Sequence, residues 1–141
     1  MPNVILIDCD GVLTDGRLTI DHRGEKFFKQ FHTRDVRAIR ELIYNGYEVV
    51  IVSCDDWMGI HHFAAKVGAD VHISRSKVEL PYRNYIAIGD DAWDIQMLKG
   101  AEIAYCPVDA DVLVCGLSGV HILDTKGGQG VIAEMARKLL K

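Results

Sequence analysis

Short runs of β-branched and other apolar residues recur along the chain and predict six β-strands. The runs are NVILID (3–8), EVVIVS (48–53), DVHIS (70–74), YIAIG (85–89), EIAYC (102–106) and VHIL (120–123). Their apolar positions are continuous rather than alternating. This pattern is typical of strands that are covered on both faces, as in a parallel sheet.

Three other segments follow a helical period of apolar and polar positions. They are RDVRAIRELIYNG (34–46), WMGIHHFAAKVG (57–68) and VIAEMARKLLK (131–141). The first two close with a glycine, which commonly follows the last turn of a helix. Because strands and helices alternate, we predict a single α/β domain over residues 1–141, with a Rossmann-like, mainly parallel sheet and helices on both faces.

Two segments depart from this alternation. Residues 17–31, RLTIDHRGEKFFKQF, contain two short strand patterns around the turn DHRG, so we expect a β-hairpin flap inserted after the first strand. Residues 75–84 connect two predicted strands, but Pro81 and the short length leave little room for a crossover helix. We therefore expect some apolar surface of the sheet to lack a helical cover there.

Composition and charge narrow the class of protein. With 141 residues, 49% of them hydrophobic and 26% charged, the chain fits one soluble globular domain. The net charge of −4 and the lack of a basic stripe argue against binding to nucleic acid. No run has the length of a membrane span or the form of a signal peptide, so we expect a cytoplasmic protein without a membrane partner. The four cysteines form no CxxC pair, and we interpret them as reduced thiols.

Aspartates gather at the ends of two predicted strands. Asp8 and Asp10 follow the first strand with one residue between them, so their side chains share a face and their charges repel. Asp90, Asp91 and Asp94 follow the fourth strand. If these strands are parallel neighbours, their carboxyl ends meet and the two acidic groups converge. Carboxylate oxygens in that number suit Mg²⁺, which would also relieve the repulsion between the first two aspartates.

Two further strand ends supply groups that phosphoryl transfer requires. Ser53 closes the second predicted strand and Lys77 follows the third, on the same rim as the acids. In such a site one carboxylate can attack phosphorus to form an aspartyl-phosphate, and a second can carry protons. Positive groups hold the phosphoryl oxygens. The sequence therefore predicts a Mg²⁺-dependent phosphatase for a small phosphorylated substrate.

These motifs resemble those of the haloacid dehalogenase (HAD) superfamily. The order DCDGVLTDG, a strand ending in serine, a lysine and then GDDAWD is shared with its capless members, typified by 3-deoxy-D-manno-octulosonate 8-phosphate phosphatase. FHTRD (31–35), the hairpin and GGQG (127–130) extend the likeness over nearly the whole chain. The resemblance implies a HAD-like fold without a cap domain and a sugar phosphate of the 3-deoxy-octulosonate or nonulosonate 8- or 9-phosphate type as substrate. It also implies a homo-oligomer, with a tetramer favoured, in which neighbouring flaps and tails help to close each site.

The resemblance also implies roles for the matching residues. Asp8 would be the nucleophile and a Mg²⁺ ligand, and Asp90 a further ligand. Asp10 would be the general acid and base, with its backbone carbonyl reaching the metal. Ser53 and Lys77 would hold the phosphoryl oxygens, and Lys77 would also orient the nucleophile. We place Asp91 and Asp94 in the outer shell of the metal, and we predict that the substrate meets Gly11, Thr14, Ser53 and Cys54.

Two departures from the family pattern keep other functions open. The chain has SCDD (53–56) where the family commonly has Thr/Ser-Gly-Arg, and GGQG (127–130) where an arginine or histidine often follows the second glycine. Both changes remove positive charge from the region that would meet an anionic sugar. The same chemistry on nucleotides or other phosphates, or a non-catalytic regulatory module on this scaffold, are the alternatives. For the glycines at 127–130, an anion cradle and a flexible lead into the last helix are equally compatible with the sequence.

Overall fold

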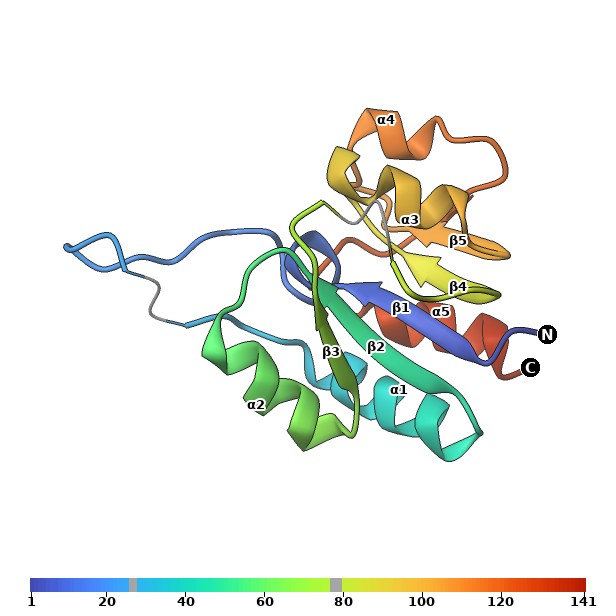
Figure 1. Ribbon diagram of the computed structural model, residues 1–141, viewed down its shortest axis with the longest axis horizontal. Helices are drawn as coiled ribbons and strands as arrows, with labels where there is room; N and C mark the ends of the chain where they lie inside the picture. Colours follow the sequence, from blue (N-terminus) through green and yellow to red (C-terminus); the bar gives the residue numbers. More distant parts are fainter. Residues whose placement is uncertain (26–27, 77–79) are drawn as a thin grey trace.

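The six predicted strands form one parallel sheet (Figure 1). The computed structural model describes residues 1–25, 28–76 and 80–141. The strand order is β3-β2-β1-β4-β5-β6, and every neighbouring pair is parallel. Each strand lies within its predicted run. The strands are β1 (Val4–Asp8), β2 (Glu48–Ser53), β3 (Asp70–Ile73), β4 (Tyr85–Ile88), β5 (Ile103–Cys106) and β6 (His121–Ile122).

The three predicted helices are present, and four shorter helical elements accompany them. The predicted helices are α1 (Thr33–Tyr44), α2 (Met58–Val67) and α5 (Val131–Leu139). The others are η1 (Cys9–Leu13), η2 (Ala92–Asp94), α3 (Ile95–Lys99) and α4 (Val112–Cys115). Gly68 ends α2 in the left-handed region with φ 86°, a conformation that a glycine adopts without steric cost.

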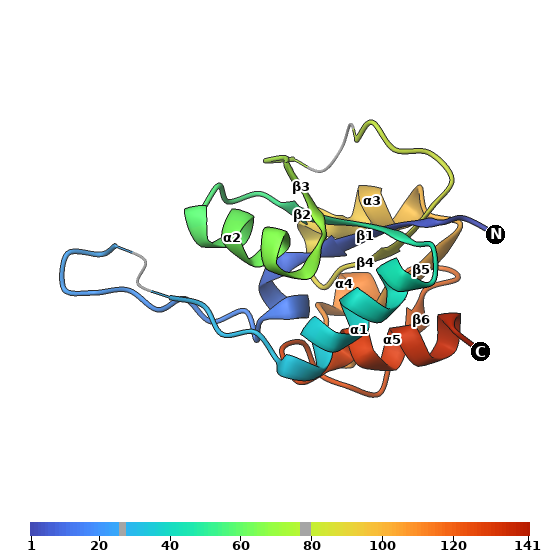
Figure 2. The same ribbon diagram turned by 90° about the horizontal axis from the view of Figure 1, so that it is seen from below.

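Helices cover both faces of the sheet, as the fold prediction required. Ile5 and Ile7 of β1 join α1, α2 and α5 in one core cluster, whereas Leu6, which points to the opposite face, joins α3 and α4 in the other. Figure 2 shows α1 and α5 on one side of the sheet and α3 on the other. The side chains of successive strand residues alternate between faces, so a continuously apolar strand supplies both cores. The parallel sheet and its two helical layers are confirmed.

The connection from β3 to β4 differs from our expectation in one respect. Its described residues (74–76 and 80–84) contain no helix, as Pro81 predicts. However, Leu80 and Tyr82 pack against the core on this face, and Val50 and Val52 beneath it are fully buried. Over the described residues the helical cover is missing, as expected, and the difference is that irregular chain packs against this part of the sheet in its place.

The segment between η1 and α1, which we name the arm (residues 15–31), projects away from the sheet (Figure 1). Its predicted turn is present: the Gly24 amide donates to the Asp21 carbonyl at 3.0 Å, and the Asp21 amide donates to the Glu25 carbonyl at 2.9 Å. On the described part of the arm, regular pairing is limited to a bridge at Ile20, and the two strands of the predicted hairpin are not otherwise formed. A two-stranded ribbon without a packed face is only marginally stable, which explains the short pairing.

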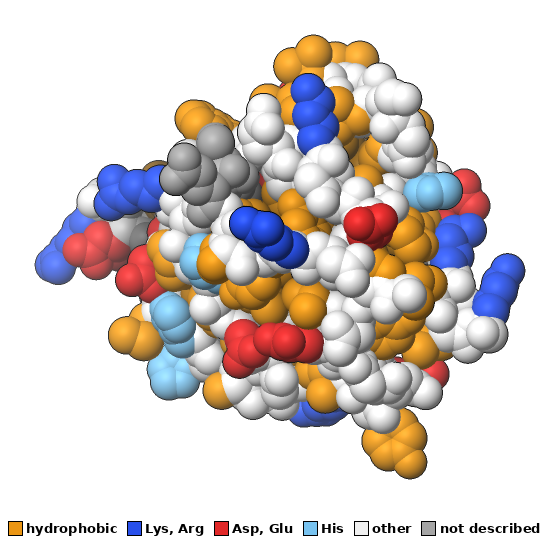
Figure 3. Space-filling view, turned by 45° about the vertical axis from the view of Figure 1, so that its right-hand side comes forward, with side chains coloured by type: hydrophobic (Ala, Val, Ile, Leu, Met, Phe, Trp, Pro, Cys, Tyr) orange, Lys and Arg blue, Asp and Glu red, His pale blue; other side chains and the backbone are white. Residues whose placement is uncertain are grey.

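Among the residues that the structure describes, none of the helices has the length and apolarity that a membrane crossing requires. On the face seen in Figure 3, acidic and basic side chains are interspersed with apolar patches. A surface that carries both charges is expected for a chain with 16 basic and 20 acidic residues, whose net charge is −4.

Candidate active site at the carboxyl ends of β1, β2 and β4

β1 places Asp8 at the carboxyl edge of the sheet, and the chain turns sharply after it. Asp8 is 6% exposed, and Gly11 lies three residues later in the left-handed region with φ 89°. A Cβ atom at Gly11 would overlap the carboxylate of Asp90. A glycine is therefore required here both by the backbone conformation and by the close approach of the loop that follows β4.

The loop after β4 brings two more carboxylates to Asp8. Asp94 is fully buried, and its Oδ2 accepts hydrogen bonds from the amides of Asp90 at 2.9 Å and Asp91 at 3.1 Å. Carboxylate oxygens of Asp8, Asp90 and Asp94 all lie within 4.8 Å of one another. Three hard oxygen donors at this spacing fit a divalent cation such as Mg²⁺. Asp91 has a different position, because its Oδ1 caps η2 by accepting from the Ala92 amide at 2.6 Å.

The carboxylate of Asp10 lies outside this group and is held by two other side chains. Lys29 Nζ donates to both of its oxygens, at 3.0 and 2.8 Å, and Thr14 Oγ1 donates to Oδ1 at 3.1 Å. Our assignment gave Asp10 a metal contact through its backbone carbonyl and left its side chain to carry protons. That assignment stays a prediction, and Asp10 lines the same cavity as the three-aspartate group.

A small cavity of about 80 Å³ unites most of the predicted site. Its lining consists of Asp8, Asp10, Ser53, Cys54, Asp90, Asp91, Trp93 and Asp94. The two other predicted substrate contacts, Gly11 and Thr14, do not line this cavity, and the Gly11 amide donates to the Thr14 hydroxyl at 3.4 Å. The Ser53 hydroxyl donates to the Asp55 carbonyl at 3.0 Å and accepts from the Asp55 amide at 3.1 Å. Lys77 lies outside the described residues.

Lys29 is the residue that our reading of the sequence missed. It occurs in the arm sequence FKQF (28–31), where a lysine among aromatic residues looks like an ordinary solvated position. In the fold its side chain is only 7% exposed, with Nζ 3.7 Å from Asp55 Oδ2 and 5.4 Å from the centre of the Trp57 ring. Sequence spacing could not reveal the contact with Asp10, because it joins residues 19 positions apart.

The two carboxylates of the SCDD segment have neighbouring side chains that the sequence does not reveal. Asp55 lies beside Lys29, and Asp56 contacts His61 with 2.6 Å between Oδ1 and Nε2. Neighbouring basic groups reduce the repulsion that these two carboxylates would exert on an anionic substrate.

The glycines at 127–130 support the nucleophile loop. The Gly128 amide donates to the Val12 carbonyl at 2.9 Å, and the Gly127 amide donates to Asp109 Oδ1 at 3.0 Å. A Cβ atom at Gly127 would overlap the Gly11 carbonyl oxygen. Because these two amides already have acceptors and the loops touch, neither a flexible lead nor an open anion cradle describes this segment.

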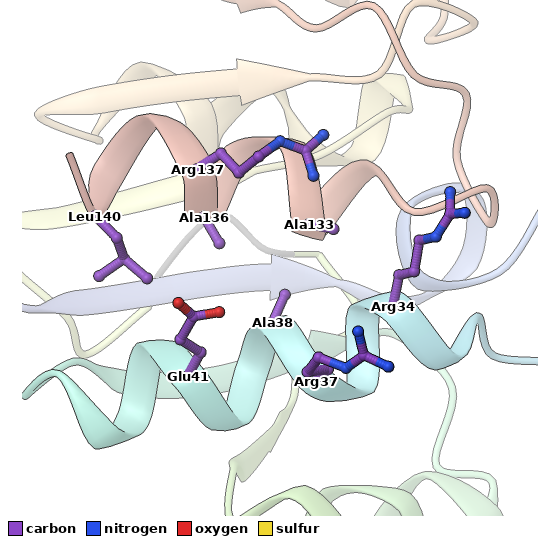
Figure 4. A pocket seen from close by; sticks show the side chains of 8 residues that line it. All are labelled: Arg34, Arg37, Ala38, Glu41, Ala133, Ala136, Arg137 and Leu140. Atoms are coloured by element: carbon purple, nitrogen blue, oxygen red, sulfur yellow. The ribbon is translucent and has the colours of Figure 1, made fainter.

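A larger cavity of about 470 Å³ lies between α1 and α5 (Figure 4). Arg34, Arg37 and Arg137 extend toward one end of it, and Glu41 and Leu140 lie toward the other. All three arginines are exposed, and none of the clustered aspartates lines the cavity. The convergent carboxylates, rather than the volume of the cavity, therefore locate the candidate active site.

Comparison with known proteins supports the fold. 3-Deoxy-D-manno-octulosonate 8-phosphate phosphatase KdsC of Haemophilus influenzae is 28% identical to this chain over an alignment of 151 positions, gaps included. The alignment covers 97% of this chain and 82% of KdsC. The cobalt-bound structure of the Haemophilus influenzae phosphatase superposes with a TM-score of 0.89 at 27% identity, over 99% of this chain and 87% of that one. The chain has the HAD fold and is similar in sequence to KdsC.

A second solved structure shows the same fold at lower identity. The Moraxella catarrhalis 3-deoxy-D-manno-octulosonate 8-phosphate phosphatase, solved with magnesium, phosphate and a 3-deoxy-D-manno-octulosonate (KDO) molecule, has a TM-score of 0.86 and 20% identity. The match covers 99% of this chain and 86% of that chain. No protein-family model matches the sequence. This chain therefore has the fold of these phosphatases at a sequence identity below 30%.

Proposed function

We propose that this HAD homologue is a Mg²⁺-dependent phosphatase that hydrolyses phosphate monoesters through an aspartyl-phosphate on Asp8. The observation that carries the proposal is the group formed by Asp8, Asp90 and Asp94, whose carboxylate oxygens lie within 4.8 Å of one another. They share a cavity with Asp10 and Ser53, and a nucleophile, a proton carrier and a metal site are thereby present together.

The proposed reaction has two steps, and each of them uses side chains of this cavity. An oxygen of Asp8 attacks phosphorus, the bond from phosphorus to the ester oxygen breaks, and Asp10 delivers a proton to the departing alkoxide. Asp10 then accepts a proton from a water molecule that attacks the aspartyl-phosphate, and this releases phosphate and regenerates Asp8. Ser53 and Lys77 are the residues that we expect to hold the phosphoryl oxygens.

Asp8 and Asp90, with the backbone carbonyl of Asp10, would hold the cation, and Asp94, which we placed in the outer shell, lies close enough to join them. When bound, Mg²⁺ would neutralise charge on the phosphoryl oxygens and on the clustered carboxylates. The Haemophilus influenzae phosphatase was solved with cobalt and the Moraxella catarrhalis enzyme with magnesium, which supports a divalent cation for this chain too.

The substitution Asp8→Asn tests the proposal, because an amide cannot act as the nucleophile. Phosphate release from p-nitrophenyl phosphate and from 3-deoxy-D-manno-octulosonate 8-phosphate in the presence of Mg²⁺ should fall to background. The unsubstituted protein should form a phosphoenzyme that hydroxylamine cleaves, and the variant should not.

Asp70→Asn is the matched control, since Asp70 is exposed and begins β3 at the opposite end of the strands. It should retain full activity. A wild-type protein that binds Mg²⁺ but releases phosphate from no phosphate ester would refute the proposal and would favour the non-catalytic module.

We propose a small sugar phosphate of the octulosonate or nonulosonate type as the substrate. The sequence similarity to KdsC supports this class, and the pairing of Asp55 with Lys29 reduces the repulsion that the SCDD segment would exert on an anionic sugar. Turnover of 3-deoxy-D-manno-octulosonate 8-phosphate should exceed turnover of nucleoside monophosphates in a side-by-side assay. The opposite ranking would assign the same chemistry to nucleotides.

We also propose a homo-oligomer, with a tetramer favoured, and a cytoplasmic location. The arm exposes Leu18, Ile20 and Phe28 at 63%, 52% and 45%, and contiguous apolar surface of this kind is commonly buried against another subunit. The four free cysteines agree with a reducing compartment. A monomeric mass by light scattering at micromolar concentration would contradict the assembly.

A further inference from the structure

Lys29 connects the arm to the group that we assign to proton transfer. We infer that Lys29 is a positioning residue that holds the Asp10 carboxylate toward the leaving group of the substrate, an inference that rests on the proposed function. Its Nζ lies 2.8 and 3.0 Å from the two carboxylate oxygens, so one ammonium group grips both of them. A carboxylate held at both oxygens has little freedom to rotate.

The contact is built into the fold and is not an incidental surface pair. The Lys29 side chain is 7% exposed although it belongs to an otherwise exposed arm, and lysines are rarely this buried without a partner. Asp55 Oδ2 lies 3.7 Å from Nζ, and the Trp57 ring centre lies 5.4 Å away. The loop after β2 thus contacts the lysine in addition to Asp10, which restricts the position of its ammonium group.

Thr14 completes the arrangement from the other direction. Its hydroxyl donates to Asp10 Oδ1 at 3.1 Å and accepts from the Gly16 amide at 3.2 Å. The carboxylate is therefore fixed by its own loop and by the arm together. Asp10 also lines the same cavity as Asp8, where the leaving oxygen of a phosphate ester would lie. Proton delivery depends on hydrogen-bond distance and alignment, so loss of Lys29 should impair this step specifically.

A comparison of two aryl phosphate esters of similar shape distinguishes a role of Lys29 in positioning Asp10 from a role in anchoring the arm. p-Nitrophenolate departs readily without a proton, whereas phenolate is more basic and gains more from an acid. Lys29→Met keeps the length of the side chain and removes its charge. We expect kcat/KM for phenyl phosphate to fall about tenfold or more, part of the roughly 10²–10⁴-fold that acid–base catalysis contributes. For p-nitrophenyl phosphate we expect a loss within about threefold. The constant kcat/KM is used because it covers the steps up to departure of the leaving group.

Matched variants complete the experiment. Lys29→Arg should restore most of the loss on phenyl phosphate, and Arg23→Met, which removes an exposed cation from the turn of the same arm, should change neither substrate. Lys29→Gln replaces the methionine variant if the latter does not fold by circular dichroism. Equal losses on both esters, or no loss on either, would overturn the inference and leave the proposed function standing. Absence of turnover by the wild-type protein on these two esters and on 3-deoxy-D-manno-octulosonate 8-phosphate and nucleoside monophosphates would overturn both.

Discussion

Replacement of Asp35 by asparagine should stabilise the protein at neutral pH and above. Asp35 lies in the first turn of α1 and is fully buried, and its Oδ1 accepts a hydrogen bond from the Ala133 amide in α5 at 3.1 Å. Its Oδ2 has no hydrogen-bond partner in the described part of the chain. Burial raises the pKa of this carboxyl group from 3.8 to about 6, although the amides of Ala133 and Ile132 act in the opposite direction. The folded state therefore favours the protonated acid.

The size of the effect follows from this difference in pKa. The rise from 3.8 to about 6, at about 1.4 kcal/mol per pKa unit, corresponds to about 3 kcal/mol between the two protonation states. Because the pKa is higher in the folded state, the favourable contribution of the protonated carboxyl is complete below pH 3.8. It is lost as the pH rises through about 6. Asparagine keeps an oxygen acceptor for Ala133 and does not ionise.

Urea denaturation of the wild-type protein and of Asp35→Asn, at intervals from pH 4 to pH 8, measures the effect. The free energy of unfolding of the variant minus that of the wild type should grow by about 2 kcal/mol between pH 4 and pH 8, with most of the change between pH 4 and pH 7, because the carboxyl of the unfolded chain is already partly ionised at pH 4. Titration of all the other groups cancels in this difference. A difference that stays constant over the whole range would show that Asp35 ionises equally well in both states and would refute the reasoning.

One further substitution and one chemical modification test the packing of the protein. Gly11→Ala should abolish activity and destabilise the fold by several kcal/mol. The new methyl group would overlap the Asp90 carboxylate, and the backbone φ of 89° is unfavourable for alanine. A folded and active variant would disprove this packing. Iodoacetamide should modify Cys54, which is exposed, and spare Cys9 and Cys106, which are buried. Burial is also the main cause that raises the pKa of Cys106 to about 12, so mass spectrometry that finds this thiol alkylated in the native protein would contradict the structure.

Local patterns were sufficient to predict the elements of the fold. The six strands of the sheet lie within their predicted apolar runs. The central strands β1, β2 and β4 are apolar almost throughout because they are buried on both faces. The short elements η2, α3 and α4 were not predicted, since three to five residues are too few to show a helical period. The connection from β3 to β4 shows a different limit. Its sequence excluded a helix correctly but did not reveal that Leu80 and Tyr82 would fold back over Val50 and Val52.

The sequence by itself determined which chemical groups reach the carboxyl edge of the sheet. Asp8, Ser53 and Asp90 end or directly follow strands, and the direction of a parallel strand fixes the edge at which such residues lie. Only the tertiary structure decided how these groups orient and which distant residues support them. The approach of the Asp94 carboxylate to Asp8 and the hydrogen bonds from Lys29 to Asp10 depend on contacts between loops. Contacts of this kind arise from packing between segments far apart in the chain, and local periodicity carries no information about them.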